Sequence, residues 1–530
     1  MTNSIAELEH DADTILIIGS NTTEMHPVLS SFIKRAVRSG RTKLIVADPR
    51  RIGMVDFADI WLRHHGGSDV ALINGIMNVI LEEDLFDHDF VSQRTEGFDE
   101  LRQKVAKYTP ELVEQICGIC EEDLRAAARL YASANAASIV YAMGITQHIS
   151  GTDNVKSLAN LAMVCGNLGI PGGGVNPLRG QNNVQGACDL GGLPNVLPGY
   201  KPVTSPEARA VCADVWGVDS LPDQPGLTVV EIVNAAEAGS VKALYIMGEN
   251  PLVSDPDLNH VKKSLKALDL LVVQDLFLTE TAQTADVVLP AACFAEKNGT
   301  FTNTERRVQR VRKAVDPPGQ ARPDADIICD LSTRMGYPMA YESASDLFDE
   351  MALVTPQYAG MSYARLNHGG LQWPCPTSTH PGTPYLHKGV FPRGRGKLHA
   401  IDWTPPPEKP SKRFPLLLST GRVLYQYHTG TMTRRAKGPS ERYPECLIEL
   451  NPADAKRYGI GEGDWVEVTS RRGSMKARAA LGEVTEEGSI FIPFHFAEAA
   501  VNNLTIAALD PIAKIPSYKV CAVRISKTQP

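Results

Sequence analysis

The feature that most constrains the fold is a succession of short apolar segments, each followed by a segment with helical spacing. Residues 14–20 (TILIIGS) form a continuous apolar run that ends in glycine and serine, which is typical of a strand buried in a parallel sheet. Residues 26–40 have helical spacing and end in glycine, and residues 42–50 form a second apolar run that ends in Asp-Pro-Arg. This order predicts a β-α-β unit, in which the helix crosses over between two strands of one sheet.

The same succession continues along the chain. Further apolar and helical segments occupy residues 137–144, 153–169, 243–251, 261–269, 270–275 and 285–290. Strands that alternate with helices in this way predict an α/β architecture. Only the alternation of strand and helix recurs along the chain, and the sequence itself shows no short-period repeat.

The composition changes towards the C-terminus. Residues 374–413 are rich in proline and predict a connecting segment. Beyond them, short apolar segments alternate with glycine-containing turns, and residues 459–479 predict a hairpin with its turn at Arg472-Gly473. We therefore expect residues 412–530 to form a separate domain that resembles a β-barrel.

The net charge, the apolar runs and the cysteines exclude several classes of protein. A formal net charge of −8 argues against nucleic acid as the main partner. No apolar run reaches the roughly 18 residues of a membrane helix, and no signal peptide is visible, so we expect a cytoplasmic protein without a membrane span. Among the ten cysteines only Cys117 and Cys120 form a CxxC motif, and without two further ligands at similar spacing this motif predicts plain helix or loop.

Polar and glycine-rich segments follow five of the predicted strands. They comprise residues 19–27, 48–50, 143–148, 248–251 and 274–279. Since ligands bind outside the carboxyl ends of the strands in an open α/β sheet, five such segments favour a large nucleotide-like ligand. Each segment alone is equally compatible with a turn that caps the next helix. No GxGxxG follows the first predicted strand and no Walker A sequence is present, so ordinary NAD or ATP binding is not indicated.

One loop concentrates polar side chains without apolar periodicity. Residues 176–192 (NPLRGQNNVQGACDLGG) place an arginine, several amides and an aspartate among glycines. Together with MGITQH, IMGENP, VVQDLFLTETAQTADVVLP and EKNGTFTNTERRVQR, the loop resembles the catalytic subunits of molybdopterin-dependent formate dehydrogenases, which belong to the oxidoreductases with two molybdopterin guanine dinucleotides. The resemblance runs from residue 1 to about residue 527. RGQNNVQGACD is specific to the formate dehydrogenase branch, whereas nitrate reductases and their relatives share the other motifs with variation.

The resemblance implies a fold and a reaction. The fold has two α/β sheet domains, over residues 1–181 and 182–400, and a C-terminal β-barrel domain over residues 412–530. The reaction is the oxidation of formate to carbon dioxide at a molybdenum or tungsten centre held by two pterins. Arg179 would hold the formate carboxylate, because a guanidinium fork pairs with a small anion through two hydrogen bonds. A nitrate reductase or another oxo-transfer enzyme is the alternative.

The resemblance also assigns cofactor-binding residues. Near the metal, Gln181 and Gln185 would bond the pterin or line the substrate path, and the MGITQH motif would contribute Met143, Gly144 and Gln147. One guanine dinucleotide would bind Gly19, Asn21, Glu24, Asp48 and Arg50. The other would bind Gly248, Glu249, Asn250, Gln274, Asp275, Thr279 and Asp286. The last domain would add pterin and phosphate contacts from Thr420, Gly421, Arg422, Tyr425, His428, Asn502, Tyr518 and Lys519.

The chain departs from the family pattern at its start. In that pattern a four-cysteine 4Fe-4S domain, and then a cysteine or selenocysteine that binds the metal with a histidine beside it, precede the segment that matches residues 1–8. No cysteine here, including Cys188, stands in that context, so the sequence assigns no metal ligand. Two explanations stay open: a reading frame interrupted at a selenocysteine codon, with Met1 an internal methionine, or a split enzyme with its first domain on another chain.

Under either explanation we expect this chain alone to be inactive. Electrons from formate would leave through the iron–sulfur portion or an electron-transfer subunit, and neither is part of the sequence. The final acceptor (NAD, a ferredoxin or a hydrogenase partner) and the choice between molybdenum and tungsten do not follow from the sequence. A fragment without cofactor, with an assembly or scaffolding role, is the non-enzymatic alternative.

Overall fold

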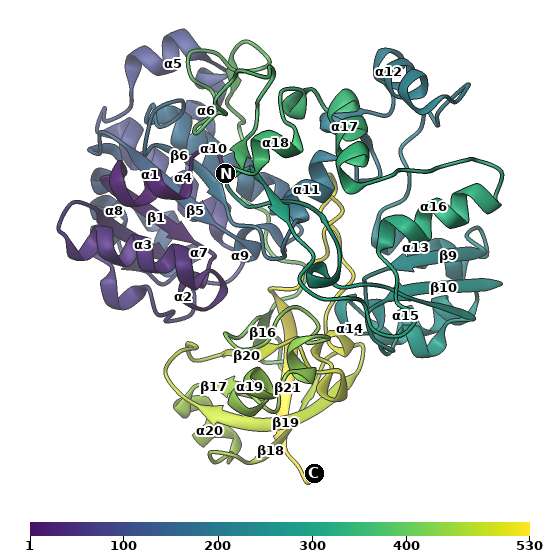
Figure 1. Cartoon of the computed structure of the whole chain (residues 1–530). Coiled ribbons are helices and arrows are strands. Elements are labelled where there is room, and N and C mark those ends of the chain that lie inside the picture. Colours follow the sequence, from purple (N-terminus) through teal and green to yellow (C-terminus); the bar gives the residue numbers. More distant parts are fainter. The chain divides into compact units, whose positions relative to one another are not determined.

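The computed structural model describes all 530 residues, which form two compact units (Figure 1). The first unit consists of residues 1–178, 253–260 and 385–530, and the second consists of residues 179–252 and 261–384. Each unit contains one parallel sheet, so the predicted α/β architecture is confirmed. No helix combines the length and the apolar character needed to cross a bilayer.

The first unit is built around a five-stranded parallel sheet in the order β3-β2-β1-β5-β6. The strands are β1 (Thr14–Ile18), β2 (Lys43–Ala47), β3 (Ile60–Leu62), β5 (Ala137–Tyr141) and β6 (Gly174–Pro177). The predicted β-α-β unit is present, since β1 and β2 pair in parallel and α3 (Pro27–Arg38) connects them. The predicted strand at residues 137–144 is also confirmed, because β5 pairs with the other edge of β1.

Helices cover both faces of this sheet. They are α1 (Ile5–His10), α2 (Thr22–Met25), α3, α4 (Asp69–Glu82), α5 (His88–Arg94), α6 (Phe98–Val105), α7 (Pro110–Cys117), α8 (Glu121–Ala132), α9 (Met143–Thr146) and α10 (Gly151–Val164). The CxxC motif is helix and loop, as expected, because Cys117 ends α7 and Cys120 immediately precedes α8. A two-stranded ribbon of β4 (Thr95–Glu96) and β15 (Gly396–Lys397) completes this part.

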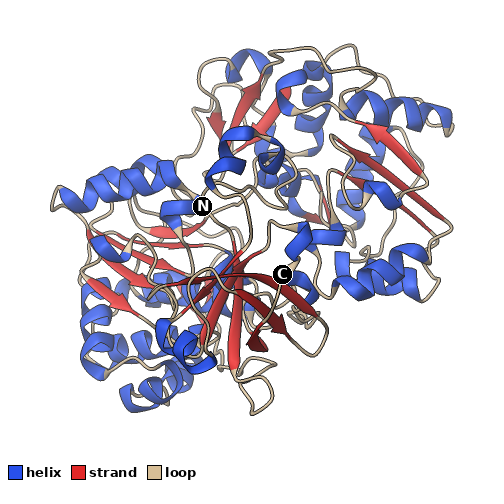
Figure 2. Cartoon of the chain, turned by 90° about the horizontal axis from the view of Figure 1, so that it is seen from below, coloured by secondary structure: helices blue, strands red, loops and turns tan.

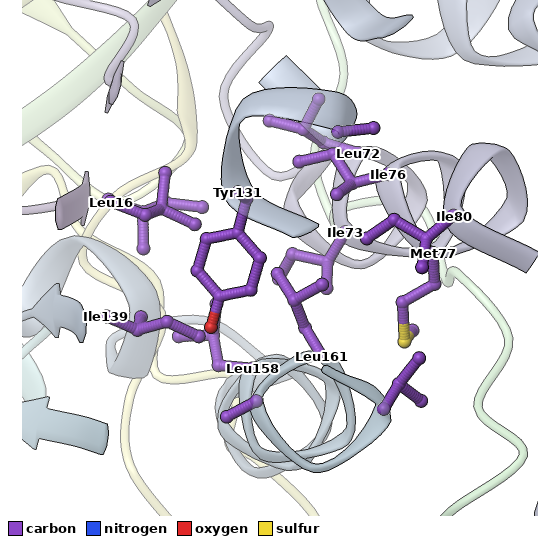
Figure 3. Packing of buried hydrophobic residues seen from close by; sticks show 14 of the residues in the cluster. Leu16, Leu72, Ile73, Ile76, Met77, Ile80, Tyr131, Ile139, Leu158 and Leu161 are labelled. Atoms are coloured by element: carbon purple, nitrogen blue, oxygen red, sulfur yellow. The ribbon is translucent and has the colours of Figure 1, made fainter. Parts of the chain in front are cut away.

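Two hydrophobic clusters explain why the strands of this sheet read as continuous apolar runs. On one face, Leu29 and Ile33 of α3 pack with Ile15 and Ile17 of β1. On the other face, Tyr131 of α8 lies among side chains from the strands and from α4 and α10, as Figure 3 shows. Since successive strand residues point to opposite faces, a strand that is buried on both sides needs an apolar residue at every position.

The predicted C-terminal barrel is confirmed and belongs to the first unit (Figure 2). Its strands are β16 (Leu416–Gly421), β17 (Leu447–Leu450), β18 (Trp465–Thr469), β19 (Ser474–Leu481), β20 (Ser489–Pro493) and β21 (Cys521–Lys527), closed in the order β16-β20-β17-β19-β18-β21. Two helices, α19 (Lys437–Arg442) and α20 (Pro452–Tyr458), lie in its connections. β18 and β19 pair antiparallel around Arg472-Gly473, which confirms the predicted hairpin.

The second unit contains a smaller parallel sheet in the order β11-β10-β9 and an antiparallel sheet in the order β12-β13-β14. The strands are β9 (Ala243–Met247), β10 (Leu270–Asp275), β11 (Val287–Pro290), β12 (Gly299–Thr302), β13 (Arg307–Val311) and β14 (Leu371–Gln372), with a ribbon of β7 (Val196–Leu197) and β8 (Lys201–Pro202). The helices between residues 184 and 366 are α11 (Val184–Asp189), α12 (Pro206–Trp216), α13 (Val229–Glu237), α14 (Pro251–Ser254), α15 (Leu258–Lys266), α16 (Asp324–Arg334), α17 (Ala344–Val354) and α18 (Tyr363–Leu366).

Candidate functional site

Two glycines join the turns that follow β1 and β5 in the first unit. Gly19 has a left-handed backbone with φ of +57°, and its N–H donates to the carbonyl of Ala47 at 3.1 Å. Its own carbonyl accepts the N–H of Gly144 at 3.0 Å. A Cβ atom on Gly19 would lie 2.8 Å from the carbonyl carbon of Gly144, so both positions need the missing side chain. The predicted residues Gly19 and Gly144 are therefore adjacent at the carboxyl end of the sheet.

Asp48 follows β2 at the same end of the sheet. Its side chain is buried, and Oδ1 accepts the backbone N–H of Arg50 at 2.9 Å. Burial raises the pKa of this carboxyl, and the amide and guanidinium groups of Arg50, together with Lys519 of the barrel domain, oppose the rise. Asp48 is thus a buried acceptor beside cations from two segments that lie far apart in the sequence.

Lys519 lies near this carboxyl and near two further cations, Arg50 and Arg422. Arg50 pairs with Glu449 of β17 (Nη2–Oε2 2.7 Å), and its buried Nε has no hydrogen-bond partner. Lys519 is half-buried, and its Nζ donates to the carbonyl of Thr420 at 2.5 Å. Burial, and then repulsion by Arg422 and Arg50, lowers the pKa of Lys519 to about 7. Three cations held this close repel one another, and an anionic ligand would remove that cost.

Two residues expected to contact the pterin also bond to the backbone of other segments. Nδ2 of Asn502 donates to the carbonyls of Val253 and Ser254 at 2.9 Å and 3.0 Å. Oγ1 of Thr420 donates to the carbonyl of Tyr518 at 3.0 Å. These contacts join residue 502 to residues 253–254 and residue 420 to residue 518, so both side chains have a structural use whatever else they bind.

The remaining predicted residues of this unit keep access to solvent. Met143 and Tyr425 are 39% and 42% exposed. Burial and the nearby Arg422 lower the pKa of His428 to about 4, so this ring is neutral at pH 7. Gln147 is the C-cap of α9, where its N–H donates to the carbonyl of Met143, and its own carbonyl accepts the N–H of Tyr518 at 3.2 Å. Glu24 is half-buried on α2, and Gly421 ends β16.

In the second unit, Gly248 and Asp275 occupy the carboxyl ends of β9 and β10. Gly248 is left-handed with φ of +66°, and its N–H donates to the carbonyl of Gln274 at 2.9 Å. Asp275 is buried, and its Oδ1 accepts the N–H of Leu276 at 2.6 Å. Glu249 is exposed in the turn that follows Gly248 and leads into α14. Gly248 and Asp275, which belong to the second predicted set of cofactor residues, are therefore brought together at the carboxyl end of the sheet.

Several other predicted residues of this set support the turns. Oδ1 of Asn250 accepts the N–H and Oγ1–H of Thr281 at 3.1 Å and 2.7 Å. Thr279 accepts the N–H of Ala282 at 3.3 Å. Oδ2 of Asp286 accepts the N–H of Leu271 at 2.7 Å, which pins the start of β11 to β10. Asn250 and Thr279 thus shape the carboxyl end of the sheet, whereas Asp286 lies at its amino end, beside the start of β10. Contact of these residues with a cofactor stays a prediction.

The Arg179 loop follows β6 and leads into α11. The N–H of Arg179 donates to Oγ1 of Thr304 at 3.0 Å, and its Nε donates to Oε1 of Gln185 at 3.2 Å. Gln185 is buried and Gln181 half-buried. Burial raises the pKa of the neighbouring Cys188 thiol, and Arg179 opposes the rise. The arginine that the sequence singles out is therefore fixed at its backbone and at one guanidinium nitrogen.

Two models of known families match the chain. The model of the molybdopterin oxidoreductases matches residues 1–334, and the model of the molybdopterin dinucleotide binding domain matches residues 416–522. The chain belongs to the molybdopterin oxidoreductase family. The matched ranges include both parallel sheets, the Arg179 loop and most of the barrel of this molybdopterin oxidoreductase.

Known relatives of this molybdopterin oxidoreductase include formate dehydrogenase subunits. The F420-dependent formate dehydrogenase subunit alpha of Methanocaldococcus jannaschii is 52% identical, with 99% of this chain and 78% of that protein covered. The assimilatory nitrate reductase catalytic subunit of Bacillus subtilis is 38% identical, with 99% of this chain and 76% of that protein covered. The structure of acetylene hydratase from Pelobacter acetylenicus shares the fold, with a TM-score of 0.79, 23% identity and coverage of 99% of this chain and 81% of that one.

The residues of the first unit fit the dinucleotide that this family binds. A diphosphate is an anion, and the cluster of Arg50, Arg422 and Lys519 offers more positive charge than Asp48 and its neighbours neutralise. The buried Nε of Arg50 and the buried Oδ1 of Asn21 have no hydrogen-bond partner in the protein. Since buried polar groups are normally paired, these atoms are positioned for a polar ligand.

Sequence reasoning missed the side chains that surround the Arg179 loop from other segments. Tyr200, Tyr358 and Trp373 all donate to the carboxylate of Asp189, four residues after Gln185. Asp189 lies in the GACD motif and could have been singled out by its position in that loop. No pattern of spacing could have shown that aromatic residues up to 184 positions away converge on it.

Proposed function

We propose that this molybdopterin oxidoreductase acts as the catalytic subunit of a formate dehydrogenase, which oxidises formate to carbon dioxide and releases two electrons and a proton. The observation that supports this proposal is the Arg179 loop. It carries the sequence RGQNNVQGACD, and it holds Arg179 by its backbone N–H on Thr304 and by its guanidinium Nε on Gln185. The 52% identity to a formate dehydrogenase subunit alpha, against 38% to a nitrate reductase, favours the same substrate.

The residues of the chain would bind the two dinucleotides and orient the formate. When bound, two molybdopterin guanine dinucleotides with molybdenum or tungsten supply an acceptor for two electrons. Arg179 binds the carboxylate oxygens of formate and turns its C–H bond away from the guanidinium. Arg50, Arg422 and Lys519 neutralise the diphosphate of one dinucleotide, while Asp48 accepts hydrogen bonds from its guanine ring. Asp275 has the latter role for the second dinucleotide, and Gln185 holds Nε of Arg179.

The electrons then need a path out of the site. We propose that they leave through a 4Fe-4S cluster on an iron–sulfur portion or an electron-transfer subunit that works with this chain. The acceptor is tested by supplying the assembled enzyme with formate and with F420, NAD, a ferredoxin or an artificial dye in turn. F420 enters this series because two relatives at 52% and 50% identity are named for it.

The substitution Arg179→Lys in the assembled enzyme tests the substrate role. Lysine keeps the charge but loses the fork, so we expect kcat/KM for formate to fall at least about 100-fold, since an unmade charge-assisted pair costs about 2–3 kcal/mol. Formate-dependent dye reduction and release of labelled carbon dioxide measure it. Arg209→Lys is the matched control, because Arg209 is also half-buried in the second unit and donates to a carbonyl, that of Val203, at 2.7 Å. Near-wild-type efficiency of Arg179→Lys would remove Arg179 from the site.

The similarity to a nitrate reductase supports one alternative substrate. The same preparations are therefore assayed with nitrate and a reduced dye. We expect formate oxidation to exceed nitrate reduction, because the loop follows the formate dehydrogenase pattern. Faster turnover of nitrate than of formate would replace the proposal.

A further inference from the structure

The carboxylate of Asp189 is buried in the second unit and surrounded by neutral donors. It is 2% exposed at the end of α11. Oδ1 accepts Nε2–H of Gln185 at 2.8 Å and the hydroxyl of Tyr200 at 2.8 Å. Oδ2 accepts the hydroxyl of Tyr358 at 2.7 Å and Nε1–H of Trp373 at 2.8 Å. Four donors thus bond to the two oxygens without a direct ion pair.

The hydrogen bonds of Gln185 fix which end of its amide faces Arg179. Nε2 donates to Asp189 and also to the hydroxyl oxygen of Tyr200, at 3.0 Å. Both amide protons are therefore used on the side of the carboxylate. Oε1 is left to accept Nε–H of Arg179 at 3.2 Å. A flipped amide would set its oxygen against the Asp189 carboxylate and its NH2 against the guanidinium, and both contacts would repel.

We propose that Asp189 is a positioning residue for the reaction: through Gln185 it holds the guanidinium of Arg179 in the orientation that receives formate. This inference rests on the proposed function, because the role of Arg179 comes from it. A carboxylate bonded directly to the guanidinium would neutralise it and compete with the substrate carboxylate. The intervening amide transmits the orientation and leaves the negative charge one side chain further away.

Asp189→Asn in the assembled enzyme tests the inference. An asparagine directs an NH2 group at neighbours that are themselves donors, so it no longer fixes the Gln185 amide. We expect the KM for formate to rise about 10- to 100-fold, as for a displaced orienting group, while guanine nucleotide content stays at the wild-type level. An unchanged KM overturns the inference.

Two further variants separate positioning from a loss of stability. Tyr358→Phe removes one donor to Oδ2 but keeps the contact between Asp189 and Gln185, so we expect lower thermal stability with an unchanged KM. Gln185→Leu cuts the link itself, and we expect the same rise in KM as for Asp189→Asn. If Asp189→Asn fails to fold, Gln185→Leu decides, and an unchanged KM there overturns the inference.

The dependence on Arg179 provides the last readout. In an Arg179→Lys background, Asp189→Asn should add less than about a twofold change in KM, since residues that act through one another are not additive. Fully additive effects of the two substitutions overturn the inference. Failure of the proposed function looks different, because the wild-type enzyme itself would then not oxidise formate. In that case the separation of Arg179 Nε from Gln185 Oε1 in a crystal structure of Asp189→Asn still tests the orienting contact.

Discussion

The parallel sheets of the two units have the same backbone arrangement at the ends of their strands but different surroundings. We call this arrangement, a left-handed glycine beside a buried aspartate, the frame. In each sheet, a left-handed glycine after the first strand donates its N–H to the last residues of the neighbouring strand: Gly19 to Ala47 at 3.1 Å, and Gly248 to Gln274 at 2.9 Å. Each neighbouring strand is followed or ended by a buried aspartate, Asp48 in the first unit and Asp275 in the second. The strand-end motif is therefore a local structure that the chain uses twice.

A second pair of aspartates extends the equivalence. Oδ2 of Asp59 accepts the N–H of Leu44 at 2.8 Å, and Oδ2 of Asp286 accepts the N–H of Leu271 at 2.7 Å. In both places the aspartate also donates its own N–H to the carbonyl of the same leucine, at 2.8 Å and 2.9 Å. The sequences FADIWL and TADVVL thus encode the same connection between the second and the third strand.

The difference lies in the charges around the frame. Near Asp48 the structure places Arg50 and Lys519, and Arg422 lies near Lys519; Arg422 and Lys519 come from the barrel domain. In the second unit the residue two positions after Asp275 is Phe277, whereas in the first unit the residue two positions after Asp48 is the cation Arg50. The frame is thus a property of short sequences, whereas the affinity for phosphate depends on what a distant segment adds to it.

The two glycines should respond differently to a side chain, and this is the largest effect that we expect. Alanine at either position costs about 1–2 kcal/mol for its left-handed backbone. At Gly19 a Cβ atom would also meet the backbone of Gly144 at 2.8 Å, whereas at Gly248 nothing lies within 4 Å. Overpacking adds about 1–3 kcal/mol at Gly19 alone. Hydrogen exchange of β1 in Gly19→Ala and of β9 in Gly248→Ala measures each unit by itself. Equal losses of protection in the two variants would contradict the role of the contact with Gly144.

The two buried aspartates test whether both frames hold a dinucleotide. Removing the carboxylate of Asp48 or Asp275 would leave guanine donors unpaired in a buried site, which costs about 1–3 kcal/mol. We expect Asp48→Ala and Asp275→Ala each to lower the molybdenum or tungsten content and the guanine nucleotide released per protein, while the fold is kept. If these carboxylates only cap turns, stability falls by about 1 kcal/mol and cofactor content stays full. Full occupancy in both variants rules out the assignment at these positions.

The sequence was sufficient for the frame because its determinants are local. Continuous apolar runs predict parallel strands, and the structure confirms β1, β2, β5, β9, β10 and β11. Burial is confirmed for those of the first unit, whereas β9 and β11 of the second unit are largely exposed. The barrel was predictable from alternating apolar residues, and its β16 is in fact buried at every second position.

The charges and partners around the frame were not predictable in the same way. Arg422 and Lys519 follow from the family resemblance, but Glu449, which pairs with Arg50, does not. That pair joins residues 399 positions apart. Their proximity depends on how the barrel packs in the first unit, and no local propensity or spacing encodes such a contact. Tyr358 and Trp373 around Asp189 were missed for the same reason.

A substitution at Asp286 separates a structural role in the sheet from contact with the dinucleotide. The resemblance assigns it to a dinucleotide, whereas the structure bonds it to the N–H of Leu271. Leu271 is buried, so Asp286→Ala leaves a buried donor unpaired and should lower stability by about 1–3 kcal/mol. If Asp286 serves only the sheet, guanine nucleotide content stays full, as we expect for Asp59→Ala in the first unit. Loss of nucleotide from Asp286→Ala would support the ligand assignment.

The smallest expected effect is a pH dependence that only the first unit should show. Burial and the cations Arg422 and Arg50 lower the pKa of Lys519 to about 7, and a bound diphosphate would raise it again. A lysine whose pKa rises on binding takes up a proton, so affinity is greatest below pH 7 and falls as pH rises through the unliganded pKa towards that of the complex. The change in affinity is limited to about tenfold per pH unit.

Calorimetry of guanosine diphosphate with the cofactor-free chain measures this change between pH 7 and pH 9, where the phosphate, with its pKa of about 6, no longer titrates. Lys519→Arg is the matched control, because arginine stays charged and should bind with an affinity independent of pH in this range. A flat profile for the wild-type chain would show that Lys519 is already protonated without a ligand. The excess positive charge near Asp48 would then be present at every pH in this range, and the contrast with the second unit would lie in the number of cations alone.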